Sequence, residues 1–383
     1  MIPRTLFTAD HEAFRDSVRR FMEAEVVPNE DRWQEQGYVD RDVWLKAGAN
    51  GFLCVSMPEE YGGAAADRLY SVVLMEEQAY ANSSSIGFGL HSEIVAPYLN
   101  RYGSAALKKK YLPRMVKGEL IGAIAMTEPG AGSDLQSIKT TAVRQGDKYV
   151  VNGSKTFITN GWNCDLVIVV AKTDPNKGAK GTSLIIVDTT MKGFTKGKRL
   201  KKMGLKGQDT SELFFDNVEV PAENLLGEEN NGFIYLMQEL PWERMQIALG
   251  AMAKTEAAIK WTIDYVNNRK AFGTPVSSFQ NTRFKLAELA TQCQVGRVFV
   301  DRCMELLMQN KLDTATASMA KMWASDIENR IIDECLQLHG GYGFMMEYPI
   351  AKAYVDARVQ RIYGGTNEIM KEVISRSLGL NKA

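Results

Sequence analysis

At 383 residues the chain is long enough for two or three domains and can bury a substantial core. It carries 46 Lys plus Arg and 46 Asp plus Glu, so the formal net charge is zero, which argues against a nucleic-acid or membrane-surface partner. The five cysteines are scattered without C-x-x-C spacing, which argues against a disulfide framework or a zinc site and favours a reducing compartment.

The first third of the chain has the helical period. Its N-terminus lacks the charged region and long apolar region of an export signal. Between residues 10 and 116 apolar residues recur at three- and four-residue spacing, as at Phe14 and Val18. Polar residues such as Asp40 stand where helices are expected to begin. We therefore expect an N-terminal helical domain over residues 1–120.

The middle of the chain changes to runs of β-branched and aromatic residues, such as Leu166–Val170 and Ser183–Val187. The pairs Gly146–Asp147 and Asn152–Gly153 stand where turns are expected. This pattern predicts a β domain over residues 121–230, built as a barrel or a sandwich. Because no G-x-G-x-x-G opens a βαβ unit, we do not expect a Rossmann nucleotide site.

Helical spacing returns after the β domain in several long segments, which predicts a helical bundle over residues 231–383. The fold class is therefore α+β, with the order helices, strands, helices and no internal repeat. No run of about 18 apolar residues occurs, so we expect no stable membrane insertion. The C-terminal residues are not a peroxisomal signal either.

A carboxylate stands in an apolar helical run at the start of this last region, two residues after a proline. Glu243, in the segment L-P-W-E-R-M, is the candidate catalytic base. A purely structural interpretation is that Glu243 caps the first turn of a helix that begins at Pro241, since proline suits the first helical position and acids suit helix N-termini. The local sequence alone favours the structural interpretation.

A loop whose residues could bind a ligand follows the first expected strand. Residues 125–134 read A-M-T-E-P-G-A-G-S-D and contain two glycines with Thr127 and Ser133. Such a loop can offer backbone N–H groups and hydroxyls to one ligand, because glycine permits close backbone approach. The same composition also suits an ordinary β turn.

Five segments together resemble the acyl-CoA dehydrogenases. The loop just described and K-x-F-I-T-N at 155–160 resemble the flavin-binding middle domain of that family. The other matches are R-K-A-F-G at 269–273 with Gln280, Q-L-H-G-G-Y-G-F at 337–344 followed by Glu347, Lys352 and Asp356, and R-I-Y-G-G-T-N-E-I at 361–369. All five occur in the order of the family, and the helix, strand, helix plan covers the whole chain.

The resemblance implies FAD as cofactor. Thr127 and the peptide groups near Met126 would hydrogen-bond the isoalloxazine ring, and Phe157 would lie on the ring face where many members have tryptophan. The residues that the resemblance assigns to FAD are Met126, Thr127, Ser133, Phe157, Ile158, Thr159, Arg269, Phe272, Gln280, Gln337, Gly340, Gly341, Thr366 and Glu368. Those from 269 to 341 would bind the FAD of a neighbouring subunit, which implies a dimer or tetramer. Structural alternatives are an interface salt bridge for Arg269 and a helix end at Gly340–Gly341.

The resemblance also bears on the position of the base. Many members carry the catalytic glutamate directly after the tyrosine of R-I-Y, where this chain has Gly364. Long-chain and isovaleryl-CoA dehydrogenases place it on the first helix of the last domain, and L-P-W-E-R-M resembles the long-chain version. We therefore expect Glu243 to be the base. Glu128 and Glu368 rank lower because they lie in flavin-contacting segments, and Glu347 because the family has no base there.

The expected chemistry needs a carboxylate whose pKa is raised by burial. By resemblance, Glu243 would remove the α proton of the thioester while hydride passes from the β carbon to flavin N5. The backbone N–H of Gly364 and a flavin ribityl hydroxyl would bind the enolate oxygen. Arg244 points about 100° away from Glu243 on a helix and is not its natural ion-pair partner. The residues assigned to the substrate are Ser133, Arg244, Tyr363, Gly364, Gly365 and Arg376.

The implied function is α,β-dehydrogenation of an acyl-CoA to the trans-2-enoyl-CoA in fatty-acid β-oxidation, with electron-transfer flavoprotein as acceptor. Small residues at Ser83–Gly89 would leave room for a medium, long or methyl-branched acyl chain, although they also suit a loop and a close helix contact. We expect the enzyme in the bacterial cytoplasm or, after processing, in the mitochondrial matrix. Alternatives are an acyl-CoA oxidase or flavin monooxygenase on the same fold, or a silent acyl-CoA-binding subunit.

Overall fold

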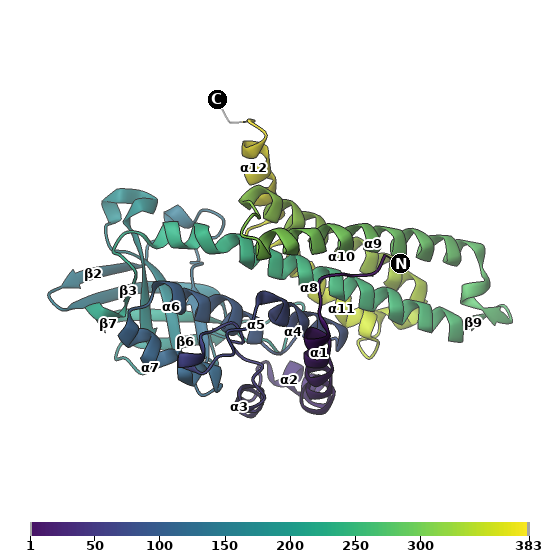
Figure 1. The fold of residues 1–383 in the computed structure, drawn as a ribbon, viewed down its shortest axis with the longest axis horizontal. Helices are drawn as coiled ribbons and strands as arrows, with labels where there is room; N and C mark the ends of the chain where they lie inside the picture. The colour runs from purple at the N-terminus through teal and green to yellow at the C-terminus, as the bar shows by residue number, and fades with distance from the viewer. Residues whose placement is uncertain (1, 381–383) are drawn as a thin grey trace.

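The computed structural model describes residues 2–380 and arranges them as an elongated molecule, with a sheet at one end and long helices at the other (Figure 1). The N-terminal helices are α1 (Ala9–Phe21), α2 (Glu30–Gln36), α3 (Arg41–Ala49), α4 (Arg68–Tyr80), α5 (Phe88–Leu90), α6 (Ala96–Tyr102) and α7 (Ala105–Val116). Asp40 occupies the N-cap position of α3, as expected. The predicted helical character of the first third is confirmed.

One eight-stranded mixed sheet follows. Its strands are β1 (Gly122–Ala125), β2 (Thr141–Gln145), β3 (Lys148–Thr159), β4 (Leu166–Lys172), β5 (Thr182–Asp188), β6 (Phe194–Arg199), β7 (Thr210–Pro221) and β8 (Leu225–Leu226). The hydrogen-bonded order is β6-β7-β3-β2-β4-β5-β8, and β1 pairs in parallel with β4. Among residues 2–380 no ladder joins β6 to β8, so the expected barrel is an open one.

The two expected turns have different outcomes. Gly146–Asp147 connects β2 to β3 as a two-residue hairpin, as predicted. The turn predicted at Asn152–Gly153 is wrong, because β3 runs through it and its register against β7 shifts there. A Cβ on Gly153 would lie 2.4 Å from Thr140 Oγ1, so the glycine allows close packing rather than a chain reversal.

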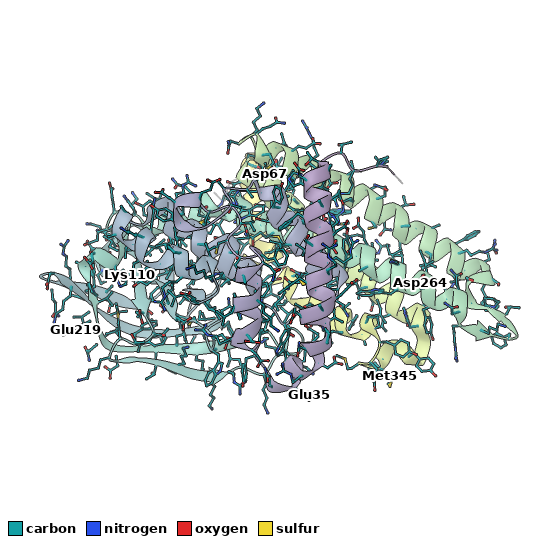
Figure 2. The ribbon with its side chains drawn as sticks, turned by 60° about the horizontal axis from the view of Figure 1, so that its bottom comes forward. Glu35, Asp67, Lys110, Glu219, Asp264 and Met345 are labelled. Atoms are coloured by element: carbon teal, nitrogen blue, oxygen red, sulfur yellow. The ribbon has the colours of Figure 1, made fainter. Side chains whose placement is uncertain are left out.

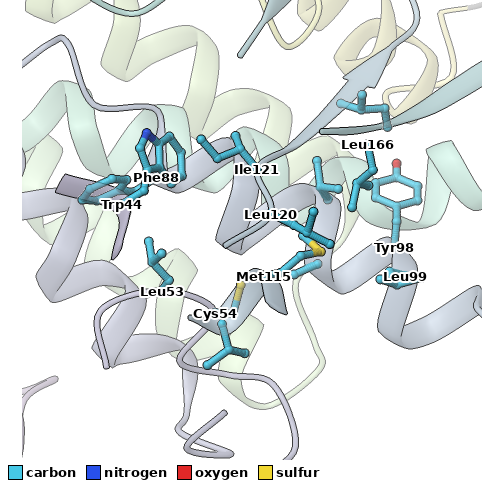
Figure 3. Close-up of a cluster of buried hydrophobic side chains, with 14 of the residues drawn as sticks. Trp44, Leu53, Cys54, Phe88, Tyr98, Leu99, Met115, Leu120, Ile121 and Leu166 are labelled. Atoms are coloured by element: carbon cyan, nitrogen blue, oxygen red, sulfur yellow. The ribbon is translucent and has the colours of Figure 1, made fainter. Parts of the chain in front are cut away.

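The sheet buries both of its faces at β4. Val167 and Val169 point into a core shared by strands from both halves of the sheet, so the sheet curves around its own interior. Ile168 and Val170 point the other way, into the core of the N-terminal helices. Figure 3 shows this second core, with Leu166 of β4 beside side chains of α6. The sheet is thereby fixed against the helical domain.

The C-terminal region consists of long helices. They are α8 (Gly232–Asn268), α9 (Gln280–Met308), α10 (Thr314–His339), α11 (Pro349–Ala357) and α12 (Asn367–Ser377), with a short hairpin of β9 (Lys270–Ala271) and β10 (Thr274–Pro275) after α8. In Figure 1, α8 starts beside the sheet and passes the N-terminal helices before it reaches β9. This helix therefore links the two ends of the molecule.

The structural interpretation of Glu243 as a first-turn cap is wrong. Pro241 lies inside α8, which begins nine residues earlier at Gly232. Pro241 lacks an N–H, so it cannot donate the usual helical hydrogen bond to the carbonyl of Met237. Leu236 and Trp242, on either side of the proline, are buried, and this packing holds the helix together through it.

The surface carries charge of both signs around the molecule, as the labelled Lys110, Glu219 and Asp264 show in Figure 2. All five cysteines are buried free thiols. Within residues 2–380, no helix is both long and apolar enough to cross a bilayer.

Candidate active site

A cavity of about 390 Å³ lies where the three regions of the chain meet. We call it the central cavity. Its lining includes Leu90 and Ile94 from the N-terminal helices, Phe157 from β3, Glu243 from α8 and Gly364 from the turn before α12. The chain segments that the sequence marked for flavin and substrate binding are therefore brought together from distant positions.

One face of α8 forms a long wall of this cavity. Glu243, Ile247, Gly250 and Lys254 all line it, at spacings of four, three and four residues. Such spacing places side chains on the same helix face. At 1.5 Å rise per residue, the eleven residues from Glu243 to Lys254 span about 16 Å. The central cavity is thus an elongated space that begins near Glu243 and extends along α8.

Glu243 is a buried carboxyl, with 8% of its surface exposed, and the hydroxyl of Tyr98 donates a hydrogen bond of 3.0 Å to its Oε1. Burial raises the pKa of Glu243 to about 7 because it disfavours the charged form, while the Tyr98 hydrogen bond acts to lower it. The nearby Glu239 acts to raise this pKa further. A carboxylate with a pKa near neutrality is well matched to proton abstraction at physiological pH.

Gly364 lies close to the next turn of α8. Its φ of +64° is a left-handed conformation that favours glycine. A Cβ at this position would lie 2.4 Å from Ile247 Cδ1. The Tyr363 hydroxyl beside it donates a 2.6 Å hydrogen bond to Gln360 Oε1. The backbone of this turn and the carboxyl of Glu243 therefore line the same cavity, and the turn itself brings no acidic side chain.

A strained residue of β3 presents an aromatic ring to the cavity. The register of β3 against β7 shifts between Lys155 and Ile158, and Phe157 has a φ of +60° within this irregularity. A left-handed conformation costs a residue with a side chain about 1–2 kcal/mol. The ring of Phe157 is 67% exposed and lines the cavity together with Met126, Thr127, Ile158 and Thr159. An exposed aromatic ring and two threonines in one cavity lining suit the isoalloxazine ring of FAD.

The loop that carries Thr127 is held in place by the buried ion pair of Lys155 and Glu128. Lys155 Nζ donates to the carbonyl of Met126 at 2.9 Å and to Glu128 Oε1 at 2.8 Å. Glu128 also accepts hydrogen bonds from the backbone N–H groups of Lys139 and Thr140. The pKa of Glu128 lies below its usual value although burial acts to raise it, because Lys155 and these donors favour the carboxylate. The carboxylate of Glu128 therefore stabilises the loop through these hydrogen bonds and its ion pair with Lys155.

A second cavity, of about 540 Å³, lies at the other end of α8. It brings together four of the predicted cofactor residues, namely Arg269, Gln337, Gly340 and Gly341. The guanidinium of Arg269 lies 5.3 Å from the ring centre of Tyr342, which also lines this cavity. Gly340 is at the same time the C-cap of α10, with a φ of +59°, so the alternative of a helix end holds for it as well.

The remaining predicted site residues line neither cavity. They are Ser133, Arg244, Phe272, Gln280, Gly365, Thr366, Glu368 and Arg376. Arg244 is buried and donates to Ser318 Oγ on α10 at 3.0 Å, because the next helical position after Glu243 faces away from the cavity. Thr366 caps the N-terminus of α12, and Arg376 pairs with Glu372 on the same helix. Glu347, another competing carboxylate, is exposed and also lies outside both linings.

Sequence reasoning missed Tyr98 as a partner of the base. It lies 145 residues before Glu243, and an isolated tyrosine in a helical pattern carries no local sign of such a contact. It also did not anticipate that Lys254, Glu328 and Asp356 would line the central cavity. These side chains come from three different helices, so only the tertiary fold reveals that they are neighbours.

Three sequence models of one family match the chain in the order of its elements. The domains described as "Acyl-CoA dehydrogenase, N-terminal domain", "middle domain" and "C-terminal domain" match residues 8–119, 123–218 and 230–379. The mitochondrial long-chain specific acyl-CoA dehydrogenase of Mus musculus is 54% identical over 377 residues, which cover 98% of this chain and 88% of that protein. The mitochondrial isovaleryl-CoA dehydrogenase of Oryza sativa subsp. japonica is 35% identical over 376 residues, covering 97% and 92%.

Solved structures agree with these relatives. The crystal structure of an acyl-CoA dehydrogenase from Geobacillus kaustophilus superposes with a TM-score of 0.96 at 50% identity, covering 98% of this chain and all of that one. The resemblance stated from the sequence motifs is thereby confirmed, together with the order of helical, sheet and helical regions. The chain belongs to the acyl-CoA dehydrogenase family, and its reaction is an FAD-dependent dehydrogenation of an acyl-CoA thioester.

Proposed function

We propose that Glu243 is the catalytic base of this enzyme and removes the α proton of the acyl-CoA thioester. The observation that carries the proposal is a buried carboxyl with a pKa of about 7 on the wall of the cavity that Phe157 and Gly364 also line. At neutral pH about half of such groups are ionised and can accept a proton. Glu128 is occupied by Lys155, while Glu347 and Glu368 lie outside the cavity.

The turn at Gly364 takes the second role. Its backbone N–H is proposed to donate a hydrogen bond to the thioester oxygen, where negative charge develops as the α proton leaves. This role needs no side chain at that position. The glycine also keeps the turn close to Ile247, because a side chain there would collide with it.

The residues around Phe157 are proposed to hold the FAD ring. The exposed face of Phe157 supplies apolar contact, and Thr127 and Thr159 supply hydroxyl donors on either side. Bound there, FAD would supply the acceptor for the hydride that leaves the β carbon of the substrate.

The second cavity is proposed to bind the dinucleotide end of an FAD that belongs to another subunit. Arg269 can pair with a phosphate through its planar guanidinium, and Gly341 permits close backbone approach. Apolar side chains near this cavity are exposed, notably Phe272 at 96% and Phe344 at 82%. Contiguous exposed apolar surface is typical of protein interfaces, which supports a homodimer or homotetramer.

A medium- or long-chain acyl group is the proposed substrate, because the cavity extends about 16 Å along α8 beyond Glu243 and includes the small residues Ser83, Ser84 and Gly89. We propose electron-transfer flavoprotein as the electron acceptor, and the bacterial cytoplasm or the mitochondrial matrix as the location. The mitochondrial location printed for the related long-chain and isovaleryl-CoA dehydrogenases supports the second of these locations.

The test is anaerobic reduction of the bound flavin by acyl-CoA. Glu243→Gln keeps the shape of the side chain and should retain FAD and acyl-CoA binding while losing flavin bleaching by at least about a thousandfold. Glu239→Gln changes a carboxylate one turn earlier that is outside the cavity lining, and it should still bleach. If Glu243→Gln bleached at the wild-type rate, another residue would have to be the base. A wild-type protein that never bleaches would be a silent acyl-CoA-binding subunit.

A further inference from the structure

One end of the central cavity is polar. Lys254 from α8, Glu328 from α10 and Asp356 from α11 all line it, and all three are buried, with Glu328 only 1% exposed. An apolar acyl tail cannot form hydrogen bonds with these polar side chains. The simplest requirement of a fatty-acyl site is an apolar wall, so these three side chains need another explanation.

Two of the three carry buried oxygens without a hydrogen-bond partner anywhere in residues 2–380, namely Glu328 Oε2 and Asp356 Oδ2. The other oxygen of Asp356 accepts a 2.5 Å hydrogen bond from the N–H of Leu205. Lys254 Nζ donates to Asn82 Oδ1 at 2.8 Å, and an ammonium has three donors. Two N–H donors of Lys254 and two carboxyl oxygens are thus unused among side chains that line the same cavity.

The neighbouring polar groups do not satisfy them. Lys352 donates to Glu30 at 2.6 Å and to the carbonyl of Asn82 at 2.5 Å. Glu30 in turn accepts hydrogen bonds from the hydroxyls of Ser83 and Ser85. Lys352 and Glu30 thus form an ion pair with each other. The unused groups of Lys254, Glu328 and Asp356 are therefore left to a ligand in the cavity.

Lys254 lies far from Glu243 along α8. Lys254 is eleven residues along α8 from Glu243, or about 16 Å. An extended carbon chain advances about 1.2 Å per bond. A group bound at Lys254 therefore belongs to the distal part of a chain with about a dozen bonds beyond the α carbon, and with somewhat fewer once the reach of the lysine side chain is included.

We propose that Lys254, Glu328 and Asp356 form a specificity subsite for a hydroxyl group near the distal end of the acyl chain. This inference rests on the proposed function, since it assumes that the thioester lies at Glu243. A hydroxyl both accepts and donates, so it can accept from Lys254 and donate to one of the free carboxyl oxygens. The substrate class is a medium- or long-chain ω-hydroxyacyl-CoA.

Charge distinguishes the hydroxyl from a distal carboxylate. Burial raises the pKa of Glu328 well above its usual range, because it disfavours the charged form of the carboxyl group. Burial lowers the pKa of Lys254 to about 8, so most of it is still protonated at neutral pH. A hydroxyl adds no charge to this end of the cavity, whereas a distal carboxylate would be buried beside the two carboxyl groups of Glu328 and Asp356.

The wild-type holoenzyme provides the first test. Anaerobic flavin reduction should be measured with unsubstituted, ω-hydroxy and ω-carboxy acyl-CoAs of about 8 to 14 carbons, a range set by the span of the cavity wall. At one chain length or more, the ω-hydroxy substrate should show kcat/KM at least about tenfold above the unsubstituted one, because a site built for a hydroxyl discriminates against its absence. Equal or better reduction by the unsubstituted or ω-carboxy series at every length would overturn the proposal.

Matched variants provide the second test. Lys254→Met removes the donor without shortening the side chain. It should bring the hydroxyl preference, the ratio of kcat/KM for the ω-hydroxy substrate to that for the unsubstituted one, close to one. Lys260→Met makes the same change on an exposed position of α8 and should keep the preference. Glu328→Leu is a second apolar variant that should also reduce it. A preference unchanged in Lys254→Met and Glu328→Leu would refute the subsite. If no acyl-CoA bleaches the wild-type flavin, the proposed function fails first, which is a separate outcome.

Discussion

The hydrogen bond from Tyr98 to Glu243 makes a quantitative prediction about the pH dependence of the reaction. A hydrogen bond to a charged group contributes about 1.5 kcal/mol or more, and one pKa unit corresponds to about 1.4 kcal/mol. Tyr98→Phe removes a donor that favours the carboxylate, so the pKa of Glu243 should rise by about one unit, from about 7 to about 8. At pH 7 the ionised fraction then falls from about one half to about one tenth.

The assay is the rate of anaerobic flavin reduction between about pH 6 and pH 9.5, a window that brackets both expected pKa values. Because Glu243 must be ionised to accept the proton, the rate should rise with pH in both proteins, with a later midpoint in Tyr98→Phe and about a fivefold lower rate at pH 7. The two curves should converge at high pH. Tyr111→Phe is the matched control, since the Tyr111 hydroxyl is buried without a partner in residues 2–380 and Tyr111 does not line the central cavity. A midpoint in Tyr98→Phe that is unchanged or moves to lower pH would refute the reasoning.

Two further predictions concern stability. Gly364→Ala should lower the thermal midpoint by the equivalent of about 1–2 kcal/mol, because alanine is strained at φ +64° and its Cβ would collide with Ile247 Cδ1. Adding Ile247→Val, which removes that Cδ1 atom, should recover part of the loss. If the double variant recovers nothing, backbone strain alone causes the loss. Glu128→Gln should lower the midpoint by up to about 3–5 kcal/mol equivalent, because it leaves Lys155 buried without its partner, and yet retain flavin bleaching. Loss of bleaching with FAD still bound would instead mark Glu128 as a base.

The sequence predicted the site best where motifs are contiguous. The flavin loop, the K-x-F-I-T-N segment and the turn at Gly364 each carry their own signature, and the fold brings parts of all three to one cavity. The same holds for Arg269 and Gln337 in the second cavity. In these cases the chemistry of neighbouring residues is enough to mark the segment.

Contacts between distant side chains could not be predicted in this way. Tyr98, Lys254 and Glu328 each occur alone within an ordinary helical pattern, and their meaning arises from which helix faces meet. The period of a helix shows that one of its faces is buried but not what that face contacts. This is why the base was identified and its hydrogen-bond donor was not.

The two wrong local predictions share a physical cause. A proline is disfavoured inside a helix and an Asn-Gly pair is favoured in a turn, but both are local preferences that tertiary packing can override. At Pro241 the burial of Trp242 and its neighbours outweighs one missing hydrogen bond. At Asn152–Gly153 the paired strand continues, and the glycine serves close packing on Thr140. Tertiary packing decided both positions.

The continuity of α8 restricts how this protein can change in length. Glu243 and Asn268, the last residue of the helix, are 25 residues apart without a break, which fixes them at about 38 Å. One inserted residue between Glu243 and Lys254 would rotate everything beyond it by about 100° and turn Lys254 out of the cavity. Insertions and deletions during divergence are therefore tolerable in the connections between helices, whereas a change in the number of residues between Glu243 and Lys254 would separate the base from the rest of its cavity wall.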